Sequence, residues 1–187
     1  MNVIFRKFSE SAKETASLKN LTICALMLAL RIILGCFANV SLNFLPNTKI
    51  GFSFLPIAIV AYLCGPIYGM IIGGLGDFLS WVIMPVGGYF FGWTLNGILV
   101  GMLYGLFLYK TKDKLLLKLI ICEVIICLFV EMLLGSLWLN IQFGKAFWVM
   151  TGIRSIDALI SLPIETGLVY LFTKTILPRI PILKQNR

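Results

Sequence analysis

The sequence predicts an all-α membrane protein built as a bundle of six transmembrane helices. Of its 187 residues, 59% are hydrophobic and only 13% are charged, which is more apolar surface than a soluble domain of this size can bury. The basic residues cluster outside the apolar runs, as in membrane proteins that obey the positive-inside rule. The net charge of +8 therefore reflects membrane topology, and no nucleic-acid partner is expected.

The chain divides into a membrane core and two charged flanks. Residues 1–19 are mixed and charged, and a helix there would be amphipathic and lie on the cytoplasmic membrane surface against lipid. Residues 20–177 form the transmembrane domain, and residues 178–187 form a basic cytoplasmic tail. No charge run or low-complexity tract indicates a second domain.

Six apolar runs are long enough to be read as spans, and three unusual stretches separate them. The spans are expected at about residues 20–40, 53–64, 67–83, 91–109, 115–137 and 152–176. Gly65-Pro66 marks a tight turn between the second and the third span. Residues 41–52 are interpreted as a loop or a short extended hairpin, and residues 84–91 and 138–151 are rich in glycine and aromatic residues.

The distribution of charge predicts the orientation of the bundle. Six spans place both termini on one side, together with the basic loop 110–118. The loops of the other side hold only Lys49 and Lys145 as cations. The positive-inside rule therefore predicts that both termini are cytoplasmic and that the three glycine-rich and aromatic stretches face outward.

The stretch Met84–Asn96, MPVGGYFFGWTLN, stands out because it carries three glycines and four aromatic residues beside spanning helices. Irregular backbone at membrane depth lines a cavity or sits at the surface. Glycine lets a ligand approach the backbone, and aromatic faces stack on flat rings. Two interpretations stay open: one wall of a small-molecule pocket, and a tight hairpin with interfacial aromatic residues.

Charged residues inside the spans allow both structural and functional interpretations. Arg31 and Asp77 lie at similar depth, which is consistent with a structural ion pair. Arg154 and Asp157 share a helix face and form either a local salt bridge or, through Arg154, a bidentate clamp for a carboxylate. Lys49 and Lys145 are solvated lysines or, together with Arg154, an anion trap.

Other function classes find less support. The chain contains no His, no nucleophile motif and no phosphate-binding loop, so it does not hydrolyse ATP itself. Asp77, Asp157 and Glu165 leave an intramembrane enzyme as an alternative, but the spacing shows no catalytic pair. A secondary transporter is a further alternative, although no internal repeat is visible. The five cysteines form no CxxC pair, and neither a metal nor a cofactor is expected.

Several motifs in order carry a resemblance to a known family. They are KIGF at 49–52, FLP at 54–56, Gly-Asp before PVGGYF, and LWL at 137–139 followed by Gly144-Lys145. Together, over roughly residues 20–175, they resemble the folate-specific substrate-binding (S) subunits of energy-coupling factor (ECF) transporters. The chain departs from the expected pattern at Trp93, where Phe is expected, and at Asp157, where an amide is expected.

The resemblance implies a bundle with an outward-facing pocket, capped by loops, that captures folate outside and releases it inside. It implies two kinds of partner, a transmembrane coupling subunit and two cytoplasmic ATPase subunits, in a bacterial plasma membrane. Small residues on the first helix contact the coupling subunit in such families, and they correspond to Ala25 and Ala29, a pair whose spacing permits close helix packing. Sister subunits share the fold, so another vitamin remains an alternative.

The residues and the resemblance together give a set of expected ligand contacts. They are Lys49, Gly51, Phe52, Gly88, Tyr89, Phe90, Trp93, Asn96, Trp138, Lys145, Arg154 and Asp157. Aromatic side chains suit the flat rings of folate, the cations suit its two carboxylates, and a carboxylate such as Asp157 suits the amino and ring N–H groups of the pterin. Which end of the ligand Arg154 and Asp157 each contact stays open.

Overall fold

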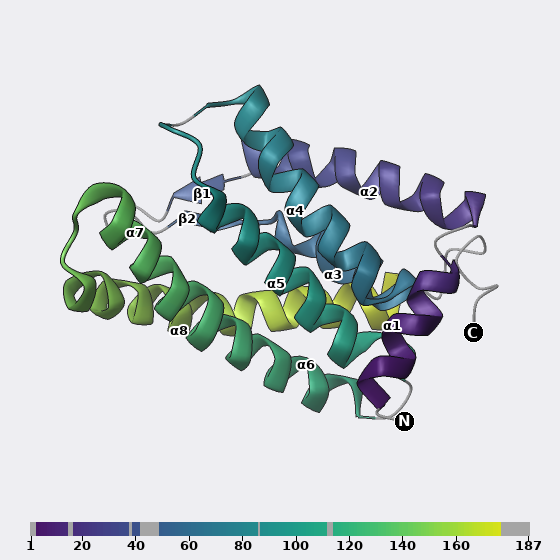
Figure 1. Cartoon of the computed structure of the whole chain (residues 1–187). Helices are drawn as coiled ribbons and strands as arrows, with labels where there is room; N and C mark the ends of the chain where they lie inside the picture. Colours follow the sequence, from purple (N-terminus) through teal and green to yellow (C-terminus); the bar gives the residue numbers. More distant parts are fainter. Residues whose placement is uncertain are drawn as a thin grey trace.

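The structure is a computed structural model. It describes residues 3–14, 17–37, 39–41, 49–85, 87–111 and 114–176. The helices are α1 (Val3–Glu14), α2 (Leu18–Phe37), α3 (Phe54–Cys64), α4 (Pro66–Ile83), α5 (Phe91–Leu108), α6 (Leu115–Ile125), α7 (Gly135–Phe143) and α8 (Phe147–Leu171). Two segments have π-helical winding, η1 (Ile126–Leu134) and η2 (Phe172–Ile176). The strands β1 (Asn39–Ser41) and β2 (Lys49–Gly51) pair antiparallel, with Val40 opposite Ile50 (Figure 1).

The helices have the length and the composition of a membrane protein. Among the described residues, four helical segments are long and apolar enough to cross a bilayer: Leu18–Cys36, Pro66–Ile83, Phe91–Leu108 and Phe147–Thr175. α3 is apolar but shorter, and α6, η1 and α7 follow one another without a break. The expected helical membrane class is confirmed. For residues 41–52 the sequence left a loop or a short extended hairpin open, and the antiparallel pairing of β1 with β2 supports the hairpin, although β1 begins at Asn39.

Three helix ends differ from the predicted spans. The first span ends at Phe37 rather than near residue 40. The fifth was expected to end near residue 137, but the helix continues to Phe143, so Trp138 lies on a helix and not in a loop. The sixth span begins at Phe147 rather than near residue 152, so only residues 144–146 of the expected irregular stretch 138–151 lie outside a helix. The aromatic and polar residues after 137 are tolerated in helices, and the first strong breaker is Gly144, whose N–H bonds to the Asn140 carbonyl.

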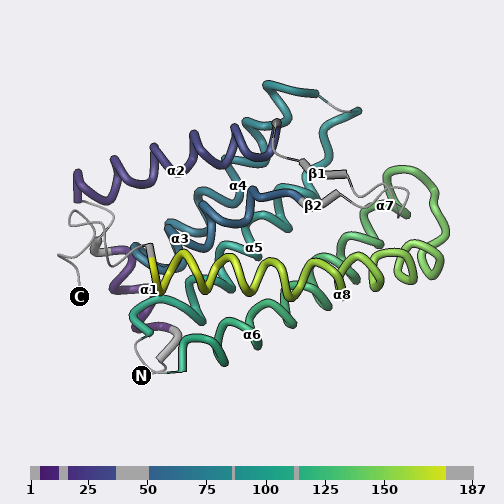
Figure 2. The backbone as a smooth tube through the Cα atoms, turned by 180° about the vertical axis from the view of Figure 1, so that it is seen from behind, coloured from purple at the N-terminus to yellow at the C-terminus, as the bar shows by residue number. Residues whose placement is uncertain are grey.

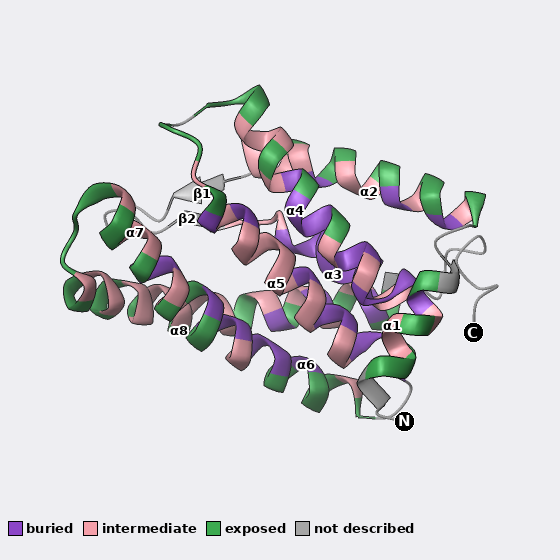
Figure 3. Ribbon diagram, in the orientation of Figure 1, coloured by how far each residue is buried: buried purple, intermediate pink, exposed green. Residues whose placement is uncertain are grey.

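α3 lies in the middle of the bundle and is buried along most of its length (Figure 3). It packs against α2, α4, α5 and α8. The largest fully buried side chains nearby are aromatic, Tyr68 on α4 and Tyr104 on α5. α2, by contrast, packs with one side only and leaves much of its surface exposed (Figures 1 and 3).

α4 and α5 approach each other more closely than any side chain would permit. Gly69 lies against Gly101, and Gly73 lies against Gly97. A Cβ atom on any of these glycines would collide with the backbone carbonyl of its partner. The four-residue spacing of Gly97, Gly101 and Gly105 in the sequence predicts such a close-packing glycine ridge, and it is the surface that joins these two helices.

The bundle has two different ends (Figures 1 and 2). One end carries α1, the turn between α3 and α4, the connection between α5 and α6, and η2. The other end carries the β-hairpin, the loop between α4 and α5, and the link between α7 and α8. The glycine-rich and aromatic segments thus gather at the end opposite to the basic segments, as the charge pattern predicted.

α1 runs across the first end of the bundle (Figure 1) and is bonded to it through Ser11. The Ser11 hydroxyl donates to the Cys64 carbonyl at 2.8 Å and accepts from the Ile67 N–H at 3.3 Å. These two backbone groups flank Gly65, whose φ of +94° favours glycine and where a Cβ would lie 2.7 Å from the Ser11 oxygen. Ser11 therefore fills the turn between α3 and α4.

Replacing Ser11 with alanine is expected to destabilise the folded chain by about 1–3 kcal/mol, because a buried carbonyl and a buried N–H lose their partner. The thermal unfolding midpoint of the detergent-solubilised protein measures this effect. Ser9→Ala is the matched control, since Ser9 is exposed on the same helix. Equal midpoints for the two variants would show that α1 is not anchored through Ser11.

Candidate ligand-binding site

A cavity of about 380 Å³ lies among α3, α5, η1, α7 and α8, beside strand β2. Its polar lining residues come from five segments and are Ser53, Tyr104, Glu131, Lys145, Arg154, Asp157, Ser161 and Glu165. Gly51 and apolar side chains complete the wall, among them Phe54, Val100, Ile126, Leu139, Met150 and Ile153. The volume lies within the range of about 300–1,000 Å³ that is typical of small-molecule sites.

One face of α8 supplies much of the polar wall. Arg154, Asp157, Ser161 and Glu165 are spaced by three, four and four residues, so they follow one stripe of the helix. From Arg154 to Glu165 the helix rises by about 16 Å at 1.5 Å per residue. Lys145 and Arg154 lie near the hairpin end, and Glu165 lies toward the middle of the bundle. Both cations of the lining therefore lie toward the hairpin end, and Glu165 lies toward the other end.

Arg154 is held in place by three neighbours. Its Nη1 donates to the Glu131 carbonyl at 3.1 Å, and its guanidinium carbon lies 5.5 Å from the centre of the Trp93 ring. It also packs on Gly135, where a Cβ would lie 2.6 Å from Nη1. The Arg154 Nε is buried and has no hydrogen-bond partner among the described residues. A carboxylate that accepts bonds from Nε and a terminal nitrogen would satisfy it.

The π-helical segment η1 connects the cavity to α5 and α8. Its consecutive carbonyls Val130 and Glu131 accept hydrogen bonds from the Asn96 amide and from Arg154, at 3.1 Å each. Ile126 and Glu131 of the same segment line the cavity. π-helical turns are frequent at functional sites. No pattern in the sequence predicts this one.

The inner part of the cavity is lined by Tyr104 and Glu165. The Tyr104 hydroxyl donates to Glu123 at 2.8 Å, and Glu123 is buried behind it. Glu165 therefore offers hydrogen-bond acceptors here to a ligand that presents N–H groups. Asp157 and Glu131 add two more carboxylates to the wall, and both lie beside Arg154.

A polar and aromatic network lies next to the cavity on α5 and α7. The Trp138 indole donates to Asn96 at 2.9 Å, and the Trp93 indole donates to Gln142 at 3.1 Å. The Gln142 amide donates to the Gly88 carbonyl at 3.2 Å, which joins α7 to the loop before α5. Phe90 packs against Trp138 with ring centres 5.6 Å apart.

The loop between α4 and α5 is also held by α4. The Trp81 indole donates to the Gly87 carbonyl at 3.1 Å, and the Tyr89 ring packs against Trp81 and Phe78. The Tyr89 hydroxyl bonds to Thr94 at 2.7 Å, and Thr94 donates to Asp77 at 2.7 Å. Tyr89 thus ties the loop to α4 rather than lining the cavity.

Arg31 and Asp77, for which a structural ion pair was one interpretation, make no nitrogen–oxygen contact within 4 Å, although the two described side chains are near enough for their charges to attract each other. Arg31 instead donates from Nη1 to the carbonyls of Ile72 at 2.6 Å and Gly73 at 2.8 Å. Its guanidinium fills the space that Gly76 leaves open on α4. Close packing at the glycine ridge makes backbone carbonyls the nearest acceptors, which sequence spacing alone does not reveal.

The structure brings four of the twelve expected contact residues to the cavity wall: Gly51, Lys145, Arg154 and Asp157. Phe90, Trp93, Asn96, Trp138 and Gly88 belong to the neighbouring network, and Tyr89 to the loop anchor. Phe52 is half-buried against the core. Lys49 lies in β2 opposite Ser41, and its side chain lies outside the described residues.

Sequence reasoning missed Glu131, Tyr104 and Ser161 as cavity residues, and it considered Glu165 only as a carboxylate for an enzyme. The stripe formed by Arg154, Asp157, Ser161 and Glu165 on one helix was a detectable signal for the α8 residues. Glu131 and Tyr104 carried no such signal.

The surface of α2 away from the bundle is exposed. Ala25 and Ala29 both lie on it, together with large apolar neighbours such as Leu26 and Ile33. The two alanines form a shallow strip between bulkier side chains. Such a strip lets another helix come close.

Comparison with known proteins agrees with this architecture. Residues 19–178 match the family model of the ECF transporter, substrate-specific component. The folate transporter FolT of Clostridium novyi (strain NT) is 32% identical over 146 residues, which cover 78% of this chain and 83% of that protein.

Two solved structures are similar to the whole bundle. A crystal structure of FolT bound with folic acid superimposes with a TM-score of 0.74 at 26% identity, covering 83% of this chain and 93% of the other. The S-component for biotin from an ECF-type ABC transporter superimposes with a TM-score of 0.56 at 27% identity, covering 81% and 90%. The chain belongs to the family of substrate-specific components of ECF transporters.

Proposed function

We propose that this chain is the folate-binding subunit of an ECF vitamin transporter, and that it is not an enzyme. The observation that carries the proposal is the distribution of charge in the cavity, with both cations at the hairpin end and the carboxylate of Glu165 at the other. Folate has the matching polarity, because a glutamate with two carboxylates lies at one end and a pterin with amino and ring N–H groups at the other. The similarity to FolT, including the structure that holds folic acid, supports the same ligand.

The arrangement along α8 favours one orientation of the ligand. The glutamate end would lie near Lys145 and Arg154. There a carboxylate would accept two hydrogen bonds from the Arg154 guanidinium, one of them from Nε, which has no partner among the described residues. The pterin would lie deeper, within reach of Asp157, Glu165 and the ring of Tyr104. The sequence left this assignment open, and the stripe on α8 is the argument for it.

The aromatic network beside the cavity has a supporting role in this proposal. Trp93 covers one side of the Arg154 guanidinium, and Asn96 holds Trp138 against the same region. A planar guanidinium that is stacked on an indole keeps a fixed direction, which favours bidentate binding. Trp93, where the resemblance implies Phe, therefore contributes to the site through Arg154.

The partners follow from family membership. An S component works with an ECF coupling module, and we propose one transmembrane coupling subunit and two cytoplasmic ATPase subunits for this chain. The strip around Ala25 and Ala29 on α2 is the proposed contact with the coupling subunit. Folate would be captured on the outer side and released inside when the chain is docked on this module.

The proposed orientation is six spans in a bacterial plasma membrane, with both termini in the cytoplasm. A cysteine placed at Ala146, in the exposed link between α7 and α8, is expected to react with an impermeant maleimide in intact cells. A cysteine at the exposed Lys114, at the opposite end, is expected to react only after permeabilisation. The background would carry alanine at the five native cysteines. Labelling of position 114 in intact cells would contradict the orientation.

The direct test of the ligand is mass spectrometry of small molecules that co-purify with the detergent-solubilised chain from cells grown in rich medium. We expect folates in the extract of the native protein and a reduced amount with Arg154→Ala. Recovery of another vitamin in place of folate would overturn the assignment and leave the family unchanged.

A further inference from the structure

The end of the bundle that carries α1 has an exposed basic surface on α1 and on the connection between α5 and α6. We call it the basic end surface, and its residues are Arg6, Lys110, Lys114 and Lys118. The side chains of Arg6 and Lys110 are 67% and 47% exposed. Among the side chains described outside the spanning helices at this end, Glu10 is the single acid.

Two cations of this surface, Arg6 and Lys118, lie close enough to Lys7 to repel it. Lys7 donates from Nζ to the Leu106 carbonyl at 2.7 Å. Burial lowers the pKa of Lys7, and the nearby charges of Lys118 and Arg6 lower the pKa further, against an opposing effect of Glu10. The one described acid therefore leaves an excess of positive charge, which an anion would relieve.

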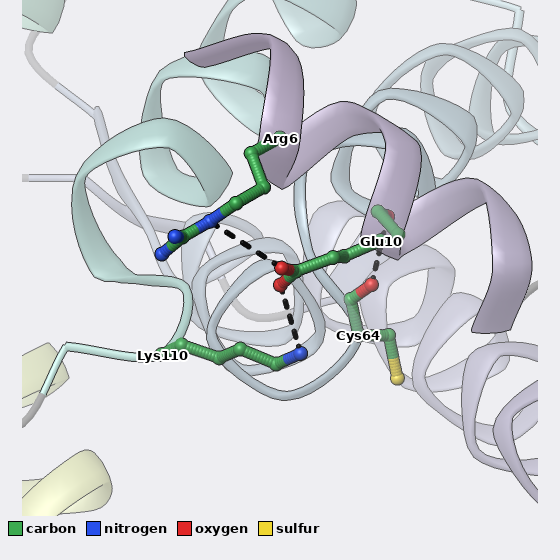
Figure 4. Close-up of polar contacts among 5 residues, drawn as sticks. Arg6, Glu10, Cys64 and Lys110 are labelled. Atoms are coloured by element: carbon green, nitrogen blue, oxygen red, sulfur yellow. Dashed lines mark hydrogen bonds and ion pairs between the residues drawn. The ribbon is translucent and has the colours of Figure 1, made fainter. Parts of the chain in front are cut away.

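The basic end surface is held in a fixed arrangement. Glu10 pairs with Arg6 at 3.4 Å and with Lys110 at 3.0 Å, so it holds one cation of α1 beside one cation of the α5–α6 connection (Figure 4). Ser11 fixes the same helix to the carbonyl of Cys64. Because these bonds already hold the cations in place, binding of an anion would immobilise few further side chains and would cost little conformational entropy.

Exposed apolar side chains occur at the same end of the bundle as the cations, and Phe5 is next to Arg6 in the sequence of α1. Phe5 on α1 is 71% exposed, and Leu18 at the start of α2 is 79% exposed. Lys114 directly precedes α6, and Lys110 follows the end of α5 by two residues. Cations within a few residues of the spans lie at headgroup depth, and exposed apolar side chains beside them fit the adjoining acyl region.

We propose that the basic end surface is a binding site for anionic phospholipids, with the headgroup phosphate between α1 and the start of α6. The excess of positive charge favours an anion, and the position at the span ends favours a lipid headgroup. The exposed side chain of Phe5, next to Arg6, supplies apolar contact for the lipid chains. The proposal does not depend on the ligand of the cavity. It assigns α1 a function beyond capping the turn at Gly65.

The test is native mass spectrometry of the full chain in mixed micelles that contain phosphatidylglycerol or phosphatidylcholine. The native protein is expected to retain phosphatidylglycerol selectively. A triple variant, Arg6→Gln with Lys114→Gln and Lys118→Gln, is expected to bind it about tenfold or more weakly, since each cation near the surface contributes to attraction. The charge-preserving control, Arg6→Lys with Lys114→Arg and Lys118→Arg, is expected to keep the selectivity.

Circular dichroism of both triple variants would verify that they fold. If the glutamine variant unfolds, the salt dependence of the native protein serves instead, because raising ionic strength from about 0.05 to 0.5 M should weaken phosphatidylglycerol binding strongly. Equal retention of the two lipids by the native protein would overturn the proposal. So would a folded glutamine variant that keeps its selectivity, or binding that does not respond to salt.

Discussion

Arg154→Ala is expected to weaken folate binding by at least about tenfold. Loss of one partner of a desolvated charge pair typically costs about 2–5 kcal/mol, which corresponds to about 30- to several thousand-fold in affinity. Arg154 suits this role, because Trp93, Gly135 and the Glu131 carbonyl fix its side chain, and its buried Nε has no hydrogen-bond partner among the described residues. Titration calorimetry on the purified chain measures the change.

A comparison of two ligands shows which end of folate Arg154 holds. If Arg154 binds the glutamate, a pterin compound that lacks the glutamate tail is expected to bind the variant and the native chain almost equally. Arg154→Lys keeps the charge but not the planar guanidinium, so its affinity for folate should fall between the affinities of the native chain and of Arg154→Ala. Arg6→Ala is the control for loss of an arginine outside the cavity. Equal weakening of both ligands would instead place Arg154 at the pterin end.

Ala29→Trp is expected to abolish folate uptake by the assembled transporter and to leave folate binding by the isolated chain unchanged. Ala29 lies on the exposed surface of α2, one turn from Ala25, and far from the cavity wall. An indole there would keep a partner helix from approaching the strip. Radiolabelled folate uptake by cells and calorimetry on the purified subunit measure the two effects separately.

Leu159→Trp is the matched control, because Leu159 is exposed on α8 and faces away from the stripe that lines the cavity. This variant adds the same indole to another helix surface and should support normal uptake. If Ala29→Trp transports folate at the native rate, the strip on α2 is not the contact with the coupling subunit.

Much of the fold could be predicted from the sequence because the relevant signals are local. Apolar runs predicted the spans, and Gly65-Pro66 predicted the turn between α3 and α4. The repeated glycines predicted the surface that joins α4 to α5. The position of α1 could not be predicted in this way. It depends on Ser11 reaching two backbone groups more than fifty residues away, and an isolated serine on an amphipathic helix carries no such information.

Charge and residue type predicted part of the candidate site. Lys145, Arg154 and Asp157 were identified as cations and an acid near the outer end, and all three line the cavity. The aromatic residues were recognised as a group, but their hydrogen bonds turn Trp93 and Trp138 toward Gln142 and Asn96. Arg31 was paired with the wrong acceptor, because backbone carbonyls compete with carboxylates and do not appear in a sequence.

The central claim is that the cavity selects folate, and competitive titration tests it most directly. Ligand-free chain would be titrated with folate alone, and then with folate in the presence of excess biotin, thiamine or riboflavin. The account predicts saturable binding of one folate per chain that none of the three competitors reduces. Saturable binding of biotin, thiamine or riboflavin, with no binding of folate, would contradict it.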